Sequence, residues 1–238
     1  MKITGQLVCG PGEADRYLEE TLREFKRLCD DVIVCLCNAG PKEKKLINKY
    51  DFRSYEDNRE WGKKQPFIKT DLLRRIGKLG TDWILVLDAD ETIPTITDRS
   101  VLEKIAKSGR EAAHFYVVNL WNDEQHYKKS MGFWNCRYYA YLPERGTQFL
   151  KKPVHCGNAP PYFYSLPPRQ TYVPHILLHK GLLKPGDRFR KSLRYNIYDP
   201  HADYKGREYY DALVLSSTGA EYDQQQVLNK INHYCQNL

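Results

Sequence analysis

An alternation of apolar strands and amphipathic helices fills the first hundred residues of this 238-residue chain. Apolar runs at 3–9, 32–37 and 83–87, with a weaker one at 52–55, are typical of strands that are covered on both faces. Segments 13–29 and 67–79 carry apolar residues at steps of three and four, and a Lys-rich segment ends at Asn48, so we expect helices there. The alternation predicts an α/β fold whose mostly parallel sheet has helices on both faces.

The second half of the chain predicts a mixed arrangement. Strands are expected at 113–121, 131–141 and 172–178, and helices at 101–108, 185–198, 206–215 and 222–234, whereas the proline-rich stretch 153–168 is expected to be a loop. No repeat or flexible linker divides the chain, so we predict a single domain over 1–238, with halves at 1–100 and 101–238.

The composition narrows the class of protein. A formal charge of +7 favours an anionic partner, which includes a nucleotide, a nucleic acid or an acidic membrane surface. No apolar run reaches the ~18 residues of a membrane span, and the first residues lack the features of a signal peptide. The cysteines form no C-x-x-C pair, which favours reduced thiols. We therefore expect a cytoplasmic protein without an integral membrane span, whose basic charge permits peripheral contact with a membrane.

Asp88 and Asp90 follow the apolar run 83–87 and carry the most chemical information. In a parallel sheet, ligands bind beyond the carboxyl ends of the strands, where the loops at Gly10 and Asn38 are also expected. Two carboxylates separated by one residue point the same way and repel each other unless a cation lies between them. A hard ion such as Mg²⁺ or Mn²⁺ suits such oxygen ligands, so the pattern predicts a metal and phosphate site. The alternative is a polar strand end that caps the following turn.

The segment 83–91 (W-I-L-V-L-D-A-D-E) resembles the D-x-D region of GT-A fold glycosyltransferases, in particular family 2 of the bacterial type. Segment 10–18 is similar to the N-E-x-x-x-L stretch that opens their first helix, and segment 31–40 is similar to their second strand, D-x-I-V-V-V-D-x-G-S. His179-Lys-Gly, the K-x-x-R-Y of 191–195 and Asp199-Pro200 resemble the C-terminal stretch of many bacterial members. The resemblance covers about residues 1–215, but Cys37 stands where the family has an aspartate and Gly12 where it has an asparagine.

The resemblance implies a GT-A type, Rossmann-like fold with a nucleotide-sugar-binding half (1–100) and an acceptor-binding half (101–238). It further implies a metal-dependent, inverting transfer of a sugar from a nucleotide-diphosphate sugar to an acceptor hydroxyl of a saccharide, a lipid-linked molecule or a protein. Asp90 and His179 would hold Mn²⁺ or Mg²⁺. The nucleotide sugar would contact the following residues: Cys9, Gly10, Glu13, Asn38, Asp57, Lys69, Asp88, Lys191 and Arg194.

Each of these assignments has a structural alternative. His179 could equally be a half-buried histidine that only forms a structural hydrogen bond. Lys191 and Arg194 share one helix face, which could simply be a solvated basic surface. Lys69 could be a surface residue that only keeps the protein soluble. For the catalytic base we predict Asp123 or Glu124, in a loop after the strand that ends at Trp121, with Glu144 and His155 as alternatives.

Three other functions compete with this prediction. The basic charge favours a nucleic-acid-binding protein, yet the acidic segment 88–91 would repel phosphate without a metal, so nucleic acid is not the expected partner. Cys37 favours a degenerate GT-A fold that only binds sugar. A nucleotidyltransferase shares the metal and the pyrophosphate chemistry.

Overall fold

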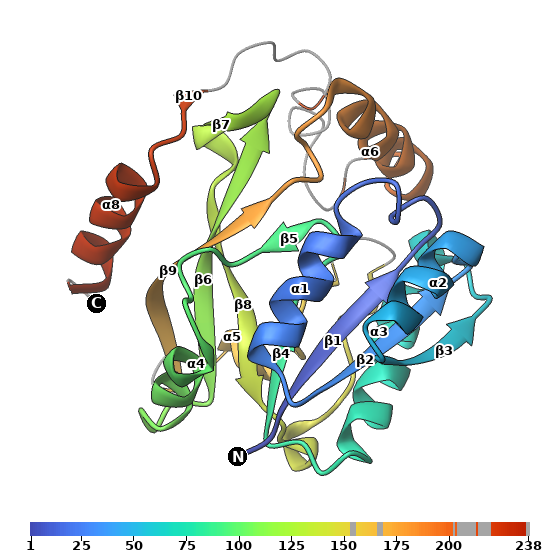
Figure 1. Cartoon of the computed structure of the whole chain (residues 1–238), viewed down its shortest axis with the longest axis horizontal. Helices are drawn as coiled ribbons and strands as arrows, with labels where there is room; N and C mark the ends of the chain where they lie inside the picture. The colour runs from blue at the N-terminus through green and yellow to red at the C-terminus, as the bar shows by residue number, and fades with distance from the viewer. Residues whose placement is uncertain (153–155, 166–168, 202, 204–212, 214–219, 237–238) are drawn as a thin grey trace.

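The computed structural model describes residues 1–152, 156–165, 169–201, 203, 213 and 220–236. Its N-terminal half is a parallel sheet made of β1 (Ile3–Cys9), β2 (Asp31–Cys37), β3 (Arg53–Asp57) and β4 (Trp83–Val86). Their spatial order is β4-β1-β2-β3, and all three pairings are parallel. Figure 1 shows these strands running in one direction, so their carboxyl ends share one edge of the sheet. The predicted α/β fold is confirmed.

Helices cover both faces of this sheet. They are α1 (Leu18–Leu28), α2 (Pro41–Lys49), α3 (Trp61–Gly77) and α4 (Arg99–Ala106). Strand β2 shows why two cores form, since its even-numbered residues Val32, Val34 and Leu36 join the core beneath α1, while its odd-numbered residues join the core beneath α3. Successive strand side chains point to opposite faces, so an apolar run of this kind requires a covering layer on each side.

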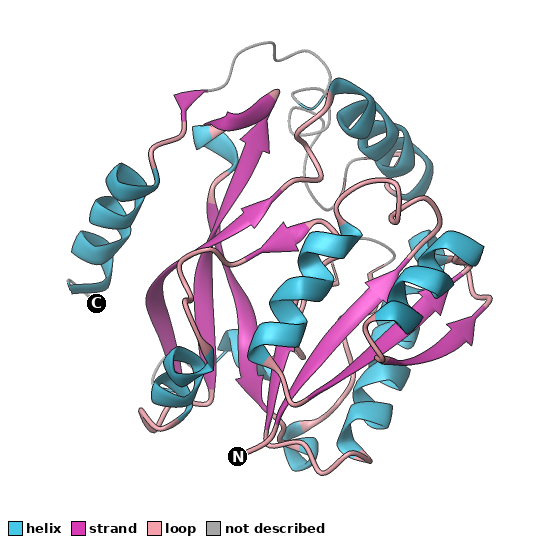
Figure 2. Cartoon of the chain, in the orientation of Figure 1, coloured by secondary structure: helices cyan, strands magenta, loops and turns pink. Residues whose placement is uncertain are grey.

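An antiparallel half extends the sheet beyond β4. It contains β6 (Ala112–Trp121), β7 (Asp123–Tyr127), β8 (Phe133–Ala140), β9 (Gln170–His179) and β10 (Ala220–Glu221). Strand β8 lies between β4 and β6 and is antiparallel to both, whereas β9 runs parallel to β6. The short strand β5 (Glu91–Thr92) pairs with the end of β9. This half also holds the helices α5 (Tyr162–Ser165), α6 (Pro185–Tyr198) and α8 (Gln224–Gln236), with 3₁₀ turns at Lys129–Met131 and Pro143–Arg145 (Figure 2).

Several predicted boundaries differ from the observed ones. The helix expected over 13–29 begins only at Leu18, because Gly12 has a positive φ of 80° and residues 11–17 form turns. The expected loop 153–168 contains the single turn of α5, and β5 and β7 were not predicted. Most of the helix expected over 206–215 lies outside the described residues. In the described ranges, no helix combines the length and the apolar composition needed to cross a bilayer.

The contact between Gly5 of β1 and Phe25 of α1 gives a test of this packing. A Cβ atom at Gly5 would lie 2.5 Å from the ring of Phe25, which is fully buried. We expect Gly5→Ala to lower the free energy of unfolding by about 1–3 kcal/mol in urea titrations, because overpacking forces the core apart. The control Gly186→Ala meets open space in α6 and should be neutral or stabilising. Equal losses for the two variants would contradict this packing.

Candidate functional site

The pairing of β5 with β9 builds the centre of the site. It places Glu91 opposite His179, and the Lys180 backbone N–H donates to the Asp90 carbonyl over 2.8 Å. As a result, the Asp90 Oδ2 and His179 Nε2 atoms are 3.6 Å apart, although the residues are far apart in sequence. The two predicted metal ligands therefore face each other beyond the carboxyl end of β4.

His179 is oriented by its neighbours. Its Nδ1 lies 2.6 Å from the Asn119 Oδ1 of β6, and its Nε2 lies 3.1 Å from the Lys191 Nζ. Burial and the nearby Lys191 ammonium hold the pKa of His179 well below its usual range, so the imidazole is neutral. Because Asn119 Oδ1 can only accept, we assign the proton to Nδ1, and the Nε2 lone pair then accepts a hydrogen bond from the Lys191 ammonium, with Asp90 close to the same nitrogen.

Gly181 explains the glycine of the His179-Lys-Gly segment in steric terms. A Cβ atom there would lie 2.1 Å from the Asp90 Oδ2 and 2.7 Å from the His179 Nε2. Any larger residue would therefore separate the aspartate from the histidine. The chain turn after β9 keeps the two side chains together only because position 181 has no side chain.

Arg137 of β8 lies beneath this pair and was missed by the sequence analysis. It is 2% exposed and forms an ion pair with Glu91, which is 1% exposed, and its Nη1 lies 3.5 Å from the Asp88 Oδ2. Burial raises the pKa of Glu91 above its usual range, whereas direct contact with the Arg137 guanidinium lowers it and favours the carboxylate form within the ion pair. Burial would also raise the pKa of Asp88, but Arg137 and Lys69 outweigh it and lower that pKa. Arg137 thus binds the carboxylates of Asp88 and Glu91, whereas the Asp90 carboxylate faces His179.

The loop after β1 adds a second charged layer. The Arg16 guanidinium contacts Glu13 at 3.1 Å and the buried Asp187 of α6 at 3.2 Å. Burial, together with the charge of Asp90, raises the pKa of Glu13 to about 7. Glu13 therefore lies within electrostatic reach of Asp90.

Basic side chains from two helices reach the same region. Lys191 of α6 contacts His179, and the Arg194 charge lowers the Glu13 pKa against the effect of burial. The Arg194 Nε is buried and has no hydrogen-bond partner in the described part of the chain. Lys69 of α3 is 6% exposed and donates to the Gly157 carbonyl at 2.6 Å and to the Asn158 Oδ1 at 2.9 Å. A purely surface role for these cations is therefore wrong.

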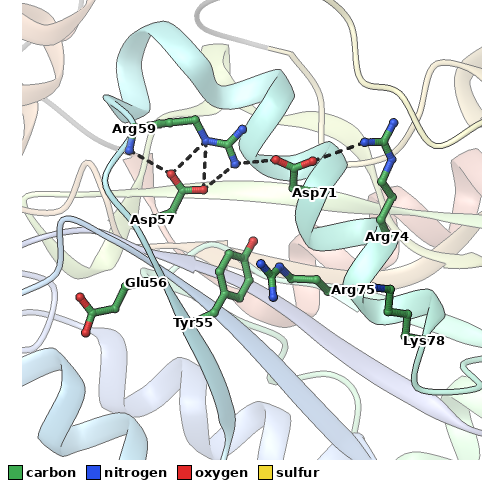
Figure 3. A pocket seen from close by; sticks show the side chains of 8 residues that line it. All are labelled: Tyr55, Glu56, Asp57, Arg59, Asp71, Arg74, Arg75 and Lys78. Carbon is green, nitrogen blue, oxygen red and sulfur yellow. Dashed lines mark hydrogen bonds and ion pairs between the residues drawn. The ribbon is translucent and has the colours of Figure 1, made fainter.

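The end of β3 and helix α3 form a separate polar cluster. Asp57 accepts hydrogen bonds from the backbone N–H, Nε and Nη2 of Arg59, and Arg59 also pairs with Asp71 at 2.7 Å. Figure 3 shows this chain of ion pairs along a surface hollow of about 290 Å³, in which Arg75 stacks on Tyr55. The Asp57 carboxylate is thus saturated by Arg59 in this structure.

Three further predicted residues lie at the carboxyl edge through their backbones. Cys9 is fully buried at the end of β1, so its thiol points into the core. Gly10 follows it and borders open space. Asn38 has a positive φ of 54° and its side chain donates to the Arg59 carbonyl at 3.3 Å. The Cys9 thiol contacts the Gly10 carbonyl and the Asn38 amide contacts the Arg59 carbonyl, so both side chains are held by local contacts.

The predicted bases Asp123 and Glu124 lie in strand β7 and not in the loop that the sequence suggested. A tight turn at Asn122, with φ of 70°, folds the chain directly into this strand. Asp123 lies 2.7 Å from the His126 Nδ1, and Glu124 pairs with Lys180 at 2.7 Å. Both carboxylates are exposed, and Lys180 connects Glu124 to the chain segment of His179. The alternative base His155 lies outside the described residues, and Glu144 is exposed in a 3₁₀ turn.

Asp90 and His179, here called the central pair, can supply part of the coordination shell of a divalent cation. Among the described residues, no group of three His, Cys, Asp or Glu side chains converges as metal ligands. Asp90 and His179 offer one oxygen and one nitrogen, and Mg²⁺ or Mn²⁺ commonly completes its coordination with water and phosphate oxygens. The Asn119 hydrogen bond fixes the imidazole as metal-bound histidines require. These two residues suit a metal that binds together with a phosphate ligand.

Comparisons with known proteins establish the class of fold. Neither a protein-family model nor a curated protein matches the sequence. Among solved structures, S. aureus TarS, a family 2-like glycosyltransferase, gives a TM-score of 0.54 at 10% identity, covering 90% of this chain and 42% of TarS. TarS 1–349 in complex with UDP-GlcNAc gives 0.50 at 10% identity, covering 90% of this chain and 70% of that chain. A 4-diphosphocytidyl-2C-methyl-D-erythritol synthase gives 0.50 at 15% identity, covering 82% and 99%.

These similarities confirm the resemblance at the level of the fold. The chain has the α/β fold of GT-A type that is shared by nucleotide-binding transferases. It spans about two fifths of the length of TarS. At such low identity the fold alone is established, so substrates and reaction are argued from the site.

The raised pKa of Glu13 gives a test of the site's electrostatics. The folded protein binds this proton more tightly than the unfolded chain does, so the contribution of Glu13 to stability falls as the pH rises from about 4.5 to about 7. We expect Glu13→Gln to raise the melting temperature at pH 8 and to leave it nearly unchanged at pH 4. Calorimetry at both pH values measures this difference. A gain of equal size at both pH values would contradict the placement of Glu13 near Asp90.

Proposed function

We propose that this protein is a glycosyltransferase that moves a sugar from a nucleotide-diphosphate sugar to an acceptor hydroxyl with inversion. The observation that carries the proposal is the 3.6 Å approach of Asp90 to His179 beside Lys191. A carboxylate and a neutral imidazole lie there beside the Lys191 ammonium, and these groups suit a metal-bound diphosphate. The GT-A type fold supports the same reading.

In this proposal Asp90 and His179 hold Mn²⁺ or Mg²⁺, which supplies positive charge against the leaving nucleoside diphosphate. Lys191 and Arg194 bind the diphosphate oxygens, and Arg194 carries a buried N–H that such an oxygen would satisfy. Asp88 contacts the ribose, and Lys69 and Arg137 keep its carboxylate ionised. Cys9, Gly10, Glu13, Asn38 and Asp57 line the nucleotide side, the first two through backbone groups.

The acceptor side is proposed to lie toward β7. Asp123 and Glu124 are the candidate bases, since both carboxylates are exposed and follow β6 directly. Of the two, Glu124 has the closer connection to the site through Lys180. The acceptor is proposed to be a saccharide, a lipid-linked molecule or a protein that presents a hydroxyl group.

A nucleotidyltransferase is the second candidate. The synthase named above matches at a TM-score of 0.50, and the match covers 99% of that chain, so nearly its whole fold has a counterpart here. Both reactions need a cation and a site for a phosphate-type leaving group. They differ in the product, because sugar transfer releases a nucleoside diphosphate whereas nucleotidyl transfer releases pyrophosphate.

Calorimetric titration with UDP and GDP, with and without Mn²⁺, tests the proposed donor site. We expect one of the two nucleotides to bind more tightly with Mn²⁺, and Asp90→Asn to remove at least about tenfold of that affinity, because a metal ligand is lost. The control Asp15→Asn changes an exposed aspartate that pairs with Lys42, and this variant should bind like the wild type. Unchanged Mn²⁺-dependent binding in Asp90→Asn would exclude the assigned metal site.

The variant Lys191→Gln tests diphosphate binding separately from metal binding. Loss of a charge-assisted hydrogen bond of ~1.5–3 kcal/mol should weaken nucleoside diphosphate binding about tenfold or more, even without Mn²⁺. Nucleoside monophosphate, which lacks the second phosphate, should lose less. Equal losses for the two nucleotides would place Lys191 away from the diphosphate.

An assay of the released product distinguishes the two candidate functions. Release of pyrophosphate from nucleoside triphosphate would favour the nucleotidyltransferase.

A further inference from the structure

Helix α6 has an inverted distribution of polar and apolar residues. Its buried face carries Asp187, Arg188 and Ser192, together with Tyr195. Its exposed face carries Phe189, Leu193 and Ile197, which are 60%, 51% and 61% exposed. These three residues, here called the apolar stripe, are spaced four apart and therefore lie on one side of the helix over successive turns.

The buried polar face of α6 is explained by the site. Asp187 binds Arg16 and the Tyr17 hydroxyl, and Arg188 donates to the carbonyls of Leu182 and Leu183. The apolar stripe has no such explanation, because bulky apolar side chains on a solvent-facing helix lose the gain that burial would give them. Single exposed apolar residues are ordinary, but three in register on one helix indicate a binding surface.

The charges around the stripe indicate what it binds. Between residues 184 and 200 both acidic side chains, Asp187 and Asp199, are buried, whereas Lys184 and Arg190 are exposed. The exposed charged side chains of α6 itself are therefore positive, although Arg190 also pairs with the buried Asp187. The exposed acid beside this helix is Glu60, which accepts a hydrogen bond from Tyr198 and is itself paired with Lys63. Helices that lie in the surface of an anionic bilayer have this combination, with apolar residues at the acyl boundary and cations at the phosphates.

We propose that α6 docks the protein on an anionic lipid membrane through the apolar stripe. Figure 1 shows α6 at the periphery of the molecule, and the loop between β1 and α1 lies beside it, as the Arg16 to Asp187 contact requires. Lys191 extends from the same helix to His179, so docking brings the candidate site to the membrane surface. Membrane binding is independent of the proposed function. Its consequence, an acceptor or product carried by a lipid, rests on that function.

Co-sedimentation with vesicles tests the proposal, without any nucleotide present. We expect the full chain to bind vesicles of phosphatidylglycerol and phosphatidylcholine more tightly than pure phosphatidylcholine, and less tightly at high ionic strength. The triple variant Phe189→Gln, Leu193→Gln, Ile197→Gln should bind at least about tenfold more weakly, because its apolar stripe is lost. Glutamine favours helices, so α6 should persist.

A matched triple variant controls for the loss of exposed apolar area. Phe67→Gln, Phe133→Gln and Leu150→Gln change side chains that are 48%, 44% and 42% exposed in other elements. This variant should bind vesicles like the wild type. Vesicle binding that both triple variants retain would overturn the proposal, as would a wild type that does not bind anionic vesicles. The wild type could instead form dimers at micromolar concentration and fail to bind vesicles. If only the α6 variant then lost the dimer, the apolar stripe would be a contact with a second copy of this chain, and the proposal would be overturned.

In either triple variant, nucleoside diphosphate binding should match the wild type, because no substituted residue lies in the candidate site. Retained nucleotide binding with lost vesicle binding supports the membrane surface alone. If the α6 triple variant unfolds, the single variant Leu193→Trp provides a second test. Its tryptophan fluorescence should shift to the blue when anionic vesicles are added. A fluorescence spectrum that vesicles do not change would count against docking.

Discussion

The buried ion pair between Arg137 and Glu91 determines how the acidic segment after β4 is arranged. Arg137 comes from β8, which lies next to β4, so its guanidinium reaches beneath the chain just where β4 ends. Breaking a buried pair leaves an uncompensated charge and is strongly destabilising. With Glu91 fixed below and Asp88 close to the same guanidinium, Asp90 remains as the carboxylate that faces His179. The antiparallel half of the sheet thus positions Asp90, which follows β4 of the parallel half, and itself supplies His179 at the end of β9.

The same constraint connects packing with chemistry. The β5 and β9 pairing sets Glu91 opposite His179, and Gly181 leaves room for both side chains of the central pair. His179 is neutral because it is buried beside the Lys191 cation, and a neutral imidazole is the form that binds a metal. Glu13 and Asp90 raise the local negative charge, which a bound cation would relieve. An acidic centre surrounded by cations suits a ligand that carries its own metal and phosphates.

The sequence predicted the strands and helices of the first half well, because periodicity is a local signal. The pattern Val32 to Cys37 requires two covering layers, and both were found. The β5 and β7 strands were missed, since β5 is only two residues long and β7 is a mostly exposed, polar segment, so neither carries much pattern. Asp123 and Glu124 were placed in a loop for that reason. Arg137 carried a usable signal, a charge within the aromatic strand 133–140, but its partner Glu91 depends on tertiary pairing. The Asn119 bond to His179 is likewise set by the register of β6 and β9.

A crystal structure grown with Mn²⁺ and a nucleoside diphosphate tests the central assignment most directly, because manganese is located by its anomalous scattering. We expect one manganese peak within bonding distance of the Asp90 Oδ2 and the His179 Nε2, with Lys191 moved from the imidazole to the diphosphate. A nucleotide bound without manganese at Asp90 and His179 would contradict the assignment. So would a manganese ion bound elsewhere while Lys191 still contacts His179.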